Sequence, residues 1–128
     1  MPAKILTIDD DEKARKLYRV ILERGGYSCI ETPAALEGIR IAEQNKIDLI
    51  ILDIQLPEVD GLAAIRLFKA YGPTKAVPVI AVTALAMPED REEVMAAGAD
   101  GYLPKPIYAK EFLRIVRYFL GGEGKKNG

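Results

Sequence analysis

Three consecutive aspartates, Asp9, Asp10 and Asp11, follow directly after a short apolar segment at residues 4–8. Carboxylates about 4 Å apart repel by roughly 1 kcal/mol in water and by about 4 kcal/mol near a protein surface. Mg²⁺ offsets such repulsion, because it prefers oxygen ligands and usually keeps several waters or phosphate oxygens. We therefore expect Asp9 and Asp10 to bind a metal ion, whereas capping of a helix is enough to explain Asp11.

Three further polar residues stand where apolar segments end: Asp53 and Thr83 close the runs at 48–53 and 78–83, and Lys105 follows residues 101–104. A carboxylate can act as a nucleophile and form an aspartyl-phosphate. In phosphoryl transfer, positioning and charge neutralisation by Mg²⁺ and a lysine do most of the work. A solvated aspartate, a strand threonine and a surface lysine are each ordinary, but their joint placement predicts a phosphoacceptor site.

The composition excludes several classes of function. The 128 residues are enough for one domain with a core, and 18 Lys and Arg against 19 Asp and Glu leave no net field to recruit nucleic acid or a membrane. No apolar run approaches the roughly 20 residues of a membrane span, so we expect a cytoplasmic domain. The chain has no histidine, which excludes Ser-His and Cys-His catalytic pairs, a histidine metal ligand and a phosphohistidine on this chain. The single cysteine, Cys29, is expected to be a small buried hydrophobe.

Hydrophobic periodicity alternates between strand-like and helical along the chain. It predicts strands at residues 4–8, 27–31, 48–53, 78–83 and 101–104, with helices at about 12–24, 33–45, 62–71, 88–97 and 108–120. Thr32 is the expected N-cap of the second helix, with Pro33 at its first position. The first helix is expected to bury one stripe of side chains, namely Ala14, Leu17, Tyr18, Ile21 and Leu22.

Five strands that are each followed by a helix predict an α/β fold. We expect a doubly wound, five-stranded parallel sheet of order 2-1-3-4-5 with five helices, that is, a flavodoxin-like fold. This domain would span residues 1–120, followed by a flexible Gly/Lys tail at 121–128. Ligands of such sheets bind at the carboxyl ends of the strands, beside the point where strand order reverses. The aspartates, Thr83 and Lys105 are therefore expected to converge on one patch.

The segments ILTIDDDEKAR, LIILDIQLPEVDG, VIAVTA and GADGYLPKP resemble the CheY-like receiver domains of two-component response regulators, over about residues 4–120. LDIQLPEVDG is similar in particular to single-domain regulators of the DivK type and to receivers of hybrid kinases. The resemblance implies that Asp53 is phosphorylated. It also implies that Mg²⁺, for which Mn²⁺ can substitute, is held by Asp9, Asp10, Asp53 and the main-chain carbonyl of Gln55.

The same resemblance assigns roles to residues near the later strands. Lys105 would be the counter-ion of the phosphoryl group and Thr83 the switch hydroxyl. Tyr102 would be the aromatic side chain that turns inward on activation, and the peptide bond before Pro106 would be cis. Activation would change the surface formed by residues 88–97, 101–104 and 108–120.

The resemblance also implies the partners. The phosphoryl group would come from a histidine kinase or a histidine phosphotransfer protein, which fits the absence of histidine here. The chain would catalyse its own phosphorylation and dephosphorylation without a separate substrate. It would signal to a downstream protein and could form a phosphorylation-dependent dimer. No direct contact with nucleic acid or membrane is expected. Candidate docking residues are Val20, opposite the buried stripe of the first helix, and Ile115 and Tyr118, which flank that of the last.

Three alternatives remain at this stage. A small haloacid-dehalogenase-type phosphatase would use Asp9 as its nucleophile, since Asp9 to Asp11 satisfy D-x-D after the first strand. However, Lys13 replaces the threonine or valine expected two residues later, and the later acidic pair is missing. The chain could also be a receiver that only binds, or a receiver fragment of a larger response regulator or hybrid kinase.

Overall fold

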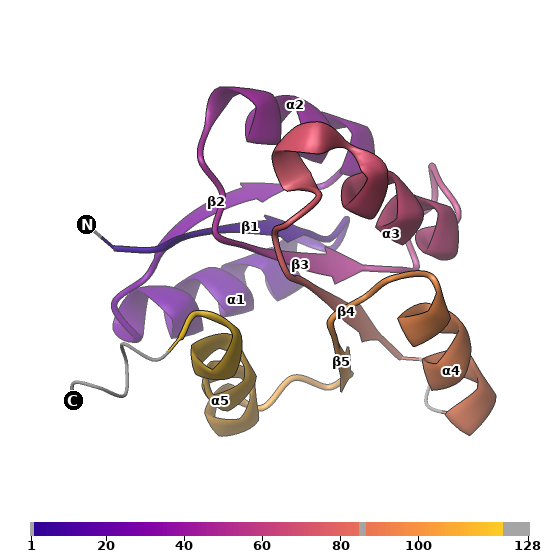
Figure 1. Ribbon diagram of the computed structural model, residues 1–128. Coiled ribbons are helices and arrows are strands. Elements are labelled where there is room, and N and C mark those ends of the chain that lie inside the picture. Colours follow the sequence, from indigo (N-terminus) through magenta and orange to yellow (C-terminus); the bar gives the residue numbers. More distant parts are fainter. Residues whose placement is uncertain (1, 85–86, 122–128) are drawn as a thin grey trace.

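A computed structural model describes residues 2–84 and 87–121 of the chain. Its centre is a parallel sheet of five strands, β1 (Lys4–Ile8), β2 (Ser28–Thr32), β3 (Leu49–Asp53), β4 (Val79–Thr83) and β5 (Gly101–Pro104). The strands lie in the order β2-β1-β3-β4-β5, as expected from the alternating pattern (Figure 1). The observed strands differ from the predicted ones by at most one residue at either end.

Helices connect the strands and cover both faces of the sheet (Figure 1). They are α1 (Glu12–Arg24), α2 (Ala35–Gln44), α3 (Gly61–Ala70), α4 (Pro88–Ala96) and α5 (Ala109–Phe119), and a short 3-10 helix, η1 (Gly72–Thr74), follows α3. One core lies between the sheet and α2, α3 and α4, and the other lies between the sheet and α1 and α5. The predicted tail at 121–128 lies outside the described residues, apart from Gly121.

The central strands are buried on both sides. Every residue of β3 and β4 is buried, which explains why their sequences are continuous apolar runs rather than alternating ones. Within β3, Ile50 and Leu52 face one core while Leu49 and Ile51 face the other. This burial makes β3 and β4 the fixed centre of the domain, and the site residues at their ends are anchored to it.

Two expectations about the helices were wrong. Leu17 was placed on the buried stripe of α1, but its side chain is 43% exposed, because the adjacent Tyr18 occupies the inward position. Thr32 was expected to cap α2, but it is still the last residue of β2, and its main-chain oxygen accepts from Asp9 N. The helix therefore begins three residues later, at Ala35, and Pro33 lies outside it.

The remaining helix signals behave as expected. Asp11 caps α1 by accepting a hydrogen bond from Lys13 N at 3.1 Å, and after the last helical residue, Arg24, come the C-cap Gly25 and Gly26 with φ +92°. Positive φ at this position favours glycine. Among the described residues, no helix is long and apolar enough to cross a membrane.

Candidate functional site

The carboxyl ends of β1, β3 and β5 bring Asp9, Asp53 and Lys105 together, as the sequence predicted. Asp9 follows β1, Asp53 ends the neighbouring β3, and Lys105 follows β5. Lys105 Nζ lies 3.2 Å from Asp9 Oδ2 and 3.4 Å from Asp53 Oδ2. One ammonium group therefore bridges two carboxylates that are 44 positions apart in the sequence.

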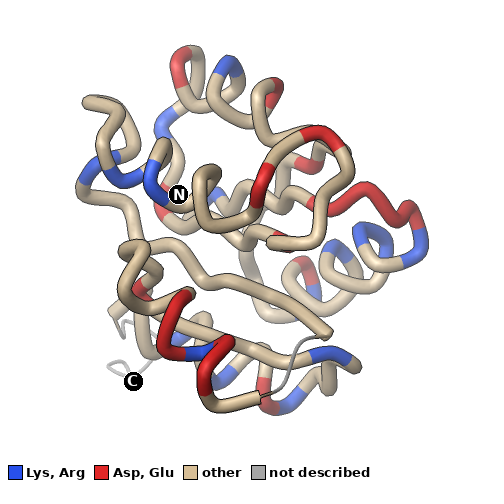
Figure 2. Tube along the Cα trace, turned by 90° about the vertical axis from the view of Figure 1, so that its right-hand side faces the viewer, with Lys and Arg blue, Asp and Glu red and all other residues tan. Residues whose placement is uncertain are grey.

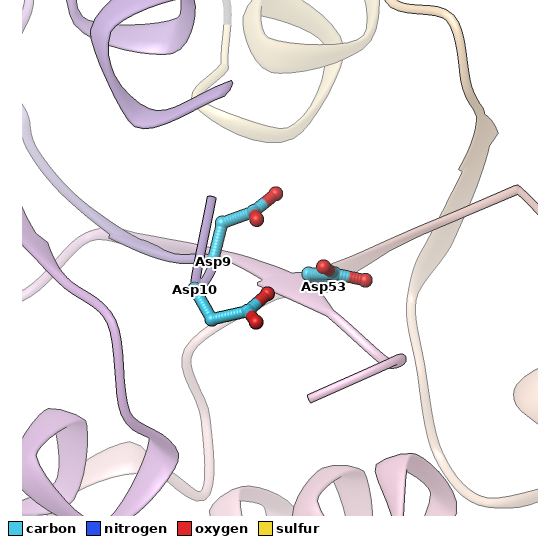
Figure 3. A group of neighbouring side chains, drawn as sticks. All are labelled: Asp9, Asp10 and Asp53. Atoms are coloured by element: carbon cyan, nitrogen blue, oxygen red, sulfur yellow. The ribbon is translucent and has the colours of Figure 1, made fainter. Parts of the chain in front are cut away.

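Asp9, Asp10 and Asp53 lie close together at this edge of the sheet, and the side chain of Asp10 extends toward Asp53 (Figure 3). Each offers a carboxylate oxygen, and these three atoms lie within 4.8 Å of one another. Asp9 and Asp53 are buried, whereas Asp10 is exposed. Three clustered carboxylates with open positions fit a magnesium ion, which takes one or two carboxylates and keeps water or phosphate oxygens as its other ligands.

Main-chain N–H groups fix the two buried carboxylates. Asp9 Oδ1 accepts a hydrogen bond from Asp11 N, and Asp53 Oδ1 accepts one from Gln55 N, both at 2.9 Å. Asp9 is also held through its main chain, because its carbonyl accepts from Arg15 Nη1 at 2.8 Å. Arg15 in turn pairs with Glu31 on β2, so β1, α1 and β2 are tied together beside the site.

The charges of Asp9 and Asp53 act strongly on each other and on Lys105 because both carboxylates are buried. Burial and the negative charge of Asp9 raise the pKa of Asp53, while the N–H of Gln55 and the ammonium of Lys105 oppose this rise. Burial by itself would lower the pKa of Lys105, but the carboxylates of Asp9 and Asp53 outweigh it and raise that pKa. Lys105 is therefore firmly cationic, and Asp53 carries its charge at a cost that a cation would relieve.

Tyr18 belongs to the site, which sequence analysis missed. Its side chain is fully buried, and its hydroxyl donates a hydrogen bond to Asp9 Oδ2 at 2.8 Å. Burial, together with the neighbouring Asp9, raises the pKa of Tyr18, so the phenol stays protonated. One feature of the sequence could have indicated this role: the buried stripe of α1 carries a tyrosine rather than an aliphatic residue, and the stripe begins beside acidic residues.

The side chain of Gln55, and not only its main chain, forms hydrogen bonds at the site. Its side-chain Oε1 accepts from Thr83 Oγ1 at 3.3 Å and from Ala84 N at 2.9 Å. Thr83 is buried at the end of β4, next to β3 as predicted. The Gln55 amide thus connects the loop after Asp53 with the loop after Thr83.

Gly61 allows the loop after Asp53 to pack closely. A Cβ atom at Gly61 would lie 2.0 Å from the carbonyl oxygen of Ile54, so only glycine fits there. Asp60 caps α3 by accepting from Leu62 N at 3.3 Å. The loop IQLPEVDG is therefore fixed at both ends, next to the carboxylate of Asp53.

The other predicted residues lie outside the carboxylate cluster. Tyr102 on β5 is half-buried against the core, and the guanidinium of Arg91 on α4 lies 5.8 Å from its ring centroid. The peptide bond between Lys105 and Pro106 is cis, as expected. Cys29 is half-buried, and burial raises the pKa of its thiol to about 11.

Two of the three candidate docking residues are exposed. Val20 is 37% exposed and Tyr118 is 78% exposed, whereas Ile115 is half-buried against the core beneath α5. Leu17, which lies one turn before Val20 on the same face of α1, extends that apolar surface. Docking at these positions stays a prediction.

Comparison with known proteins gives one consistent result. Residues 5–117 match the model of the response regulator receiver domain. The chain is 39% identical to the polar-differentiation response regulator DivK of Brucella anthropi, over 94% of this chain and 98% of that protein. The DivK protein of Brucella ovis is 38% identical, with the same coverage.

Solved structures give the same result for the fold. The chemotaxis protein CheY4 of Vibrio cholerae superposes with a TM-score of 0.88 at 27% identity, covering 94% of this chain and all of that one. The receiver domain of a sensor histidine kinase from Pseudomonas aeruginosa superposes with a TM-score of 0.86 at 32% identity, covering 95% of this chain and 100% of that one. That structure has a magnesium ion coordinated in its active site cleft.

Proposed function

This chain belongs to the response regulator receiver domains, a family of phosphorylation-dependent switches, and we propose that Asp53 is its phosphoacceptor. The observation that carries the proposal is the placement of Asp53 between two other carboxylates and the ammonium of Lys105. Membership of this family also argues against the phosphatase alternative, in which Asp9 would be the nucleophile. Asp9 is a poorer nucleophile on geometry, since its two oxygens accept hydrogen bonds of 2.9 and 2.8 Å, whereas Oδ2 of Asp53 has a longer contact, 3.4 Å to Lys105 Nζ.

The transfer step uses the carboxylate of Asp53. Its Oδ1 is fixed by Gln55 N, which leaves Oδ2, on the side of Lys105, to attack phosphorus. The bond between phosphorus and the nitrogen of the donor histidine breaks, and its electron pair stays on the histidine ring. Receiver domains interact with histidine kinases and with downstream targets, so we propose a histidine kinase or histidine phosphotransfer protein as the donor.

The residues around Asp53 would compensate the added charge. A phosphoryl group adds roughly −1.5 to −2 charges at a site that is already acidic. Asp9, Asp10, Asp53 and the main-chain carbonyl of Gln55 would hold Mg²⁺, which neutralises phosphoryl oxygens when it is bound. Lys105 would turn toward the phosphoryl group as its counter-ion, and Thr83 would donate its hydroxyl to a phosphoryl oxygen. Dephosphorylation would use the same residues: water attacks phosphorus, the bond between phosphorus and Asp53 Oδ2 breaks, and inorganic phosphate leaves while Asp53 returns to a carboxylate.

Output would pass through α4, β5 and α5. Movement of Thr83 toward the phosphoryl group would leave space for Tyr102, which now contacts Arg91 of α4. The charged residues of α4 are mostly acidic, namely Glu89, Asp90, Glu92 and Glu93 against the single Arg91, and Figure 2 shows their red segments along this helix. We therefore expect a downstream protein, or a second copy in a phosphorylation-dependent dimer, to present basic residues to α4.

Mass spectrometry tests the proposal directly. After treatment with acetyl phosphate and Mg²⁺, the wild-type chain should gain one phosphoryl group, and peptide mapping should place it on Asp53. The Asp53→Ala variant should stay unmodified, and the exposed cap variant Asp11→Asn should behave like the wild type. Repeating the experiment with Mn²⁺ tests the proposed substitution. A phosphoryl group on Asp9, or none on the wild type, would contradict the proposal.

A further inference from the structure

Tyr18 stands out among the buried side chains because its two ends have different surroundings. Its ring packs in the core between α1 and α5, with a ring centroid 5.6 Å from that of Phe112. Its hydroxyl lies at the acidic site and donates to Asp9 Oδ2. Phenylalanine would supply the same packing, so core burial alone does not explain the hydroxyl.

The hydroxyl completes the set of donors around Asp9. Oδ1 accepts from Asp11 N, while Oδ2 accepts from Tyr18 and lies 3.2 Å from Lys105 Nζ. The side chain of Asp9 is 0% exposed, so water does not compete for these contacts. Together the donors on both oxygens fix the plane of the carboxylate.

Lys105 is the weaker of the two partners of Oδ2. It is shared with Asp53, and in the proposed transfer step it turns toward the phosphoryl group. The hydroxyl of Tyr18 cannot follow, because its ring is buried and packed against Phe112. It is therefore the donor that continues to orient Asp9 when the charge of Lys105 is used elsewhere.

We infer that Tyr18 is a positioning residue for metal binding: its hydroxyl holds the Asp9 carboxylate in the orientation in which it contributes to the cation site. The inference rests on the proposed function, in which Asp9 is one of the groups that hold Mg²⁺. Groups that hydrogen-bond to metal ligands orient those ligands, and their removal typically weakens metal affinity about 10- to 100-fold.

The test compares Tyr18→Phe with the wild type in a Mn²⁺ titration, followed by the electron paramagnetic resonance signal of the free ion. We expect the dissociation constant of Tyr18→Phe to rise by about 10-fold or more. The matched control is Tyr27→Phe, because Tyr27 packs against the same core and its hydroxyl makes no hydrogen bond within the part of the chain that the structure describes. Its dissociation constant should equal that of the wild type.

A second pair of variants separates positioning from a general loss of packing. In an Asp9→Asn background, Tyr18→Phe should cause no further loss of affinity, because the group it orients is already changed. In the acetyl phosphate reaction, Tyr18→Phe should raise the Mg²⁺ concentration needed for half-maximal rate, while the rate at saturating Mg²⁺ stays near that of the wild type.

Each outcome has a defined meaning. Equal Mn²⁺ affinity of Tyr18→Phe and the wild type, or full additivity with Asp9→Asn, would overturn the inference and leave the proposed function intact. A wild-type chain that binds no Mn²⁺ would overturn both. If Tyr18→Phe lowers the rate at saturating Mg²⁺ but leaves the Mg²⁺ concentration for half-maximal rate unchanged, Tyr18 has another role and the positioning role is rejected.

Discussion

The side-chain oxygen of Gln55 lies 3.3 Å from the hydroxyl of Thr83 and accepts its hydrogen bond. The residue two positions after the proposed phosphoacceptor therefore holds the hydroxyl that is proposed to contact the phosphoryl group. The same oxygen accepts from Ala84 N, so both loops are joined through one amide. Engagement of Thr83 with a phosphoryl oxygen has to compete with this bond.

Replacing Gln55 with alanine should ease that competition. Since a neutral hydrogen bond contributes about 0.5–1.5 kcal/mol, Gln55→Ala should bind beryllofluoride about 2- to 10-fold more tightly in the presence of Mg²⁺. Titration followed by tyrosine fluorescence measures this affinity. Gln44→Ala, at an exposed position near the end of α2, is the control and should not change it. Unchanged or weaker binding by Gln55→Ala would show that the amide does not restrain Thr83.

Removing the charge of Asp53 should stabilise the metal-free protein. Its pKa is raised in the folded state, so the folded protein holds this proton more tightly than the unfolded chain does, and stability falls as the pH rises from the pKa of the unfolded state through the raised pKa. Asp53→Asn should therefore raise the free energy of unfolding at neutral pH by about 1–2 kcal/mol. The gain should shrink as the pH falls through the raised pKa, because the wild-type carboxyl then becomes neutral too.

Thermal unfolding in a chelating buffer across this pH range tests the effect of Asp53→Asn. Asp11→Asn should serve as the control, since asparagine caps a helix as well as aspartate does. A gain in stability that stays constant with pH would argue against titration of Asp53 as its cause.

Removing Lys105 should have the opposite effect on stability. Lys105→Met leaves Asp9 and Asp53 without the cation between them, so we expect a loss of about 1–3 kcal/mol in the free energy of unfolding without metal. Urea unfolding in a chelating buffer measures it, with the exposed Lys110→Met on α5 as the control. Mg²⁺ should recover part of the loss, since it replaces the missing positive charge. Equal stability of Lys105→Met and the wild type would mean that the ion pairs contribute nothing.

The exposed apolar side of α1 should matter for phosphotransfer between proteins. Val20→Asp or Leu17→Asp should slow transfer from a phosphorylated histidine protein about fivefold or more, if these residues are central contacts of the interface. Phosphorylation by acetyl phosphate should be unchanged, because both side chains are outside the carboxylate cluster. Leu36→Asp, at an exposed position of α2, is the matched control. Normal transfer to Val20→Asp would remove Val20 from the docking surface.

Much of this structure could be predicted because local patterns and topology agree. Continuous apolar runs identified β3 and β4, and the alternation of elements predicted a parallel sheet, for which the order 2-1-3-4-5 is the usual one with five strands. Once that order is known, Asp9, Asp53 and Lys105 must meet, since parallel strands place their carboxyl ends on one edge. The cluster thus follows from the positions of strand ends, which are strongly marked in the sequence.

The parts that were missed depend on side-chain direction. Leu17 and Tyr18 are adjacent, and helical spacing alone could not decide which of them faces inward. The hydroxyl of Tyr18 was missed for the same reason, because a stripe pattern counts its ring but ignores its polar end. Thr32 has the sequence features of an N-cap, yet its pairing with β1 keeps it in the sheet. Long-range pairing outweighed a local preference there.

Asp53 is part of the ladder between β3 and β4, in register with Val82, and the next residue, Ile54, also donates its N–H to the carbonyl of Val82 at 3.1 Å. The proposed acceptor is thus attached to the buried centre of the sheet, and such core strands open least readily. If a phosphoryl group is added to Asp53, the main chain of Asp53 would not shift to relieve the resulting strain, because it is held in the sheet. The loops and the outer helices would move instead, so that a change of a few atoms at Asp53 alters a surface that another protein can bind.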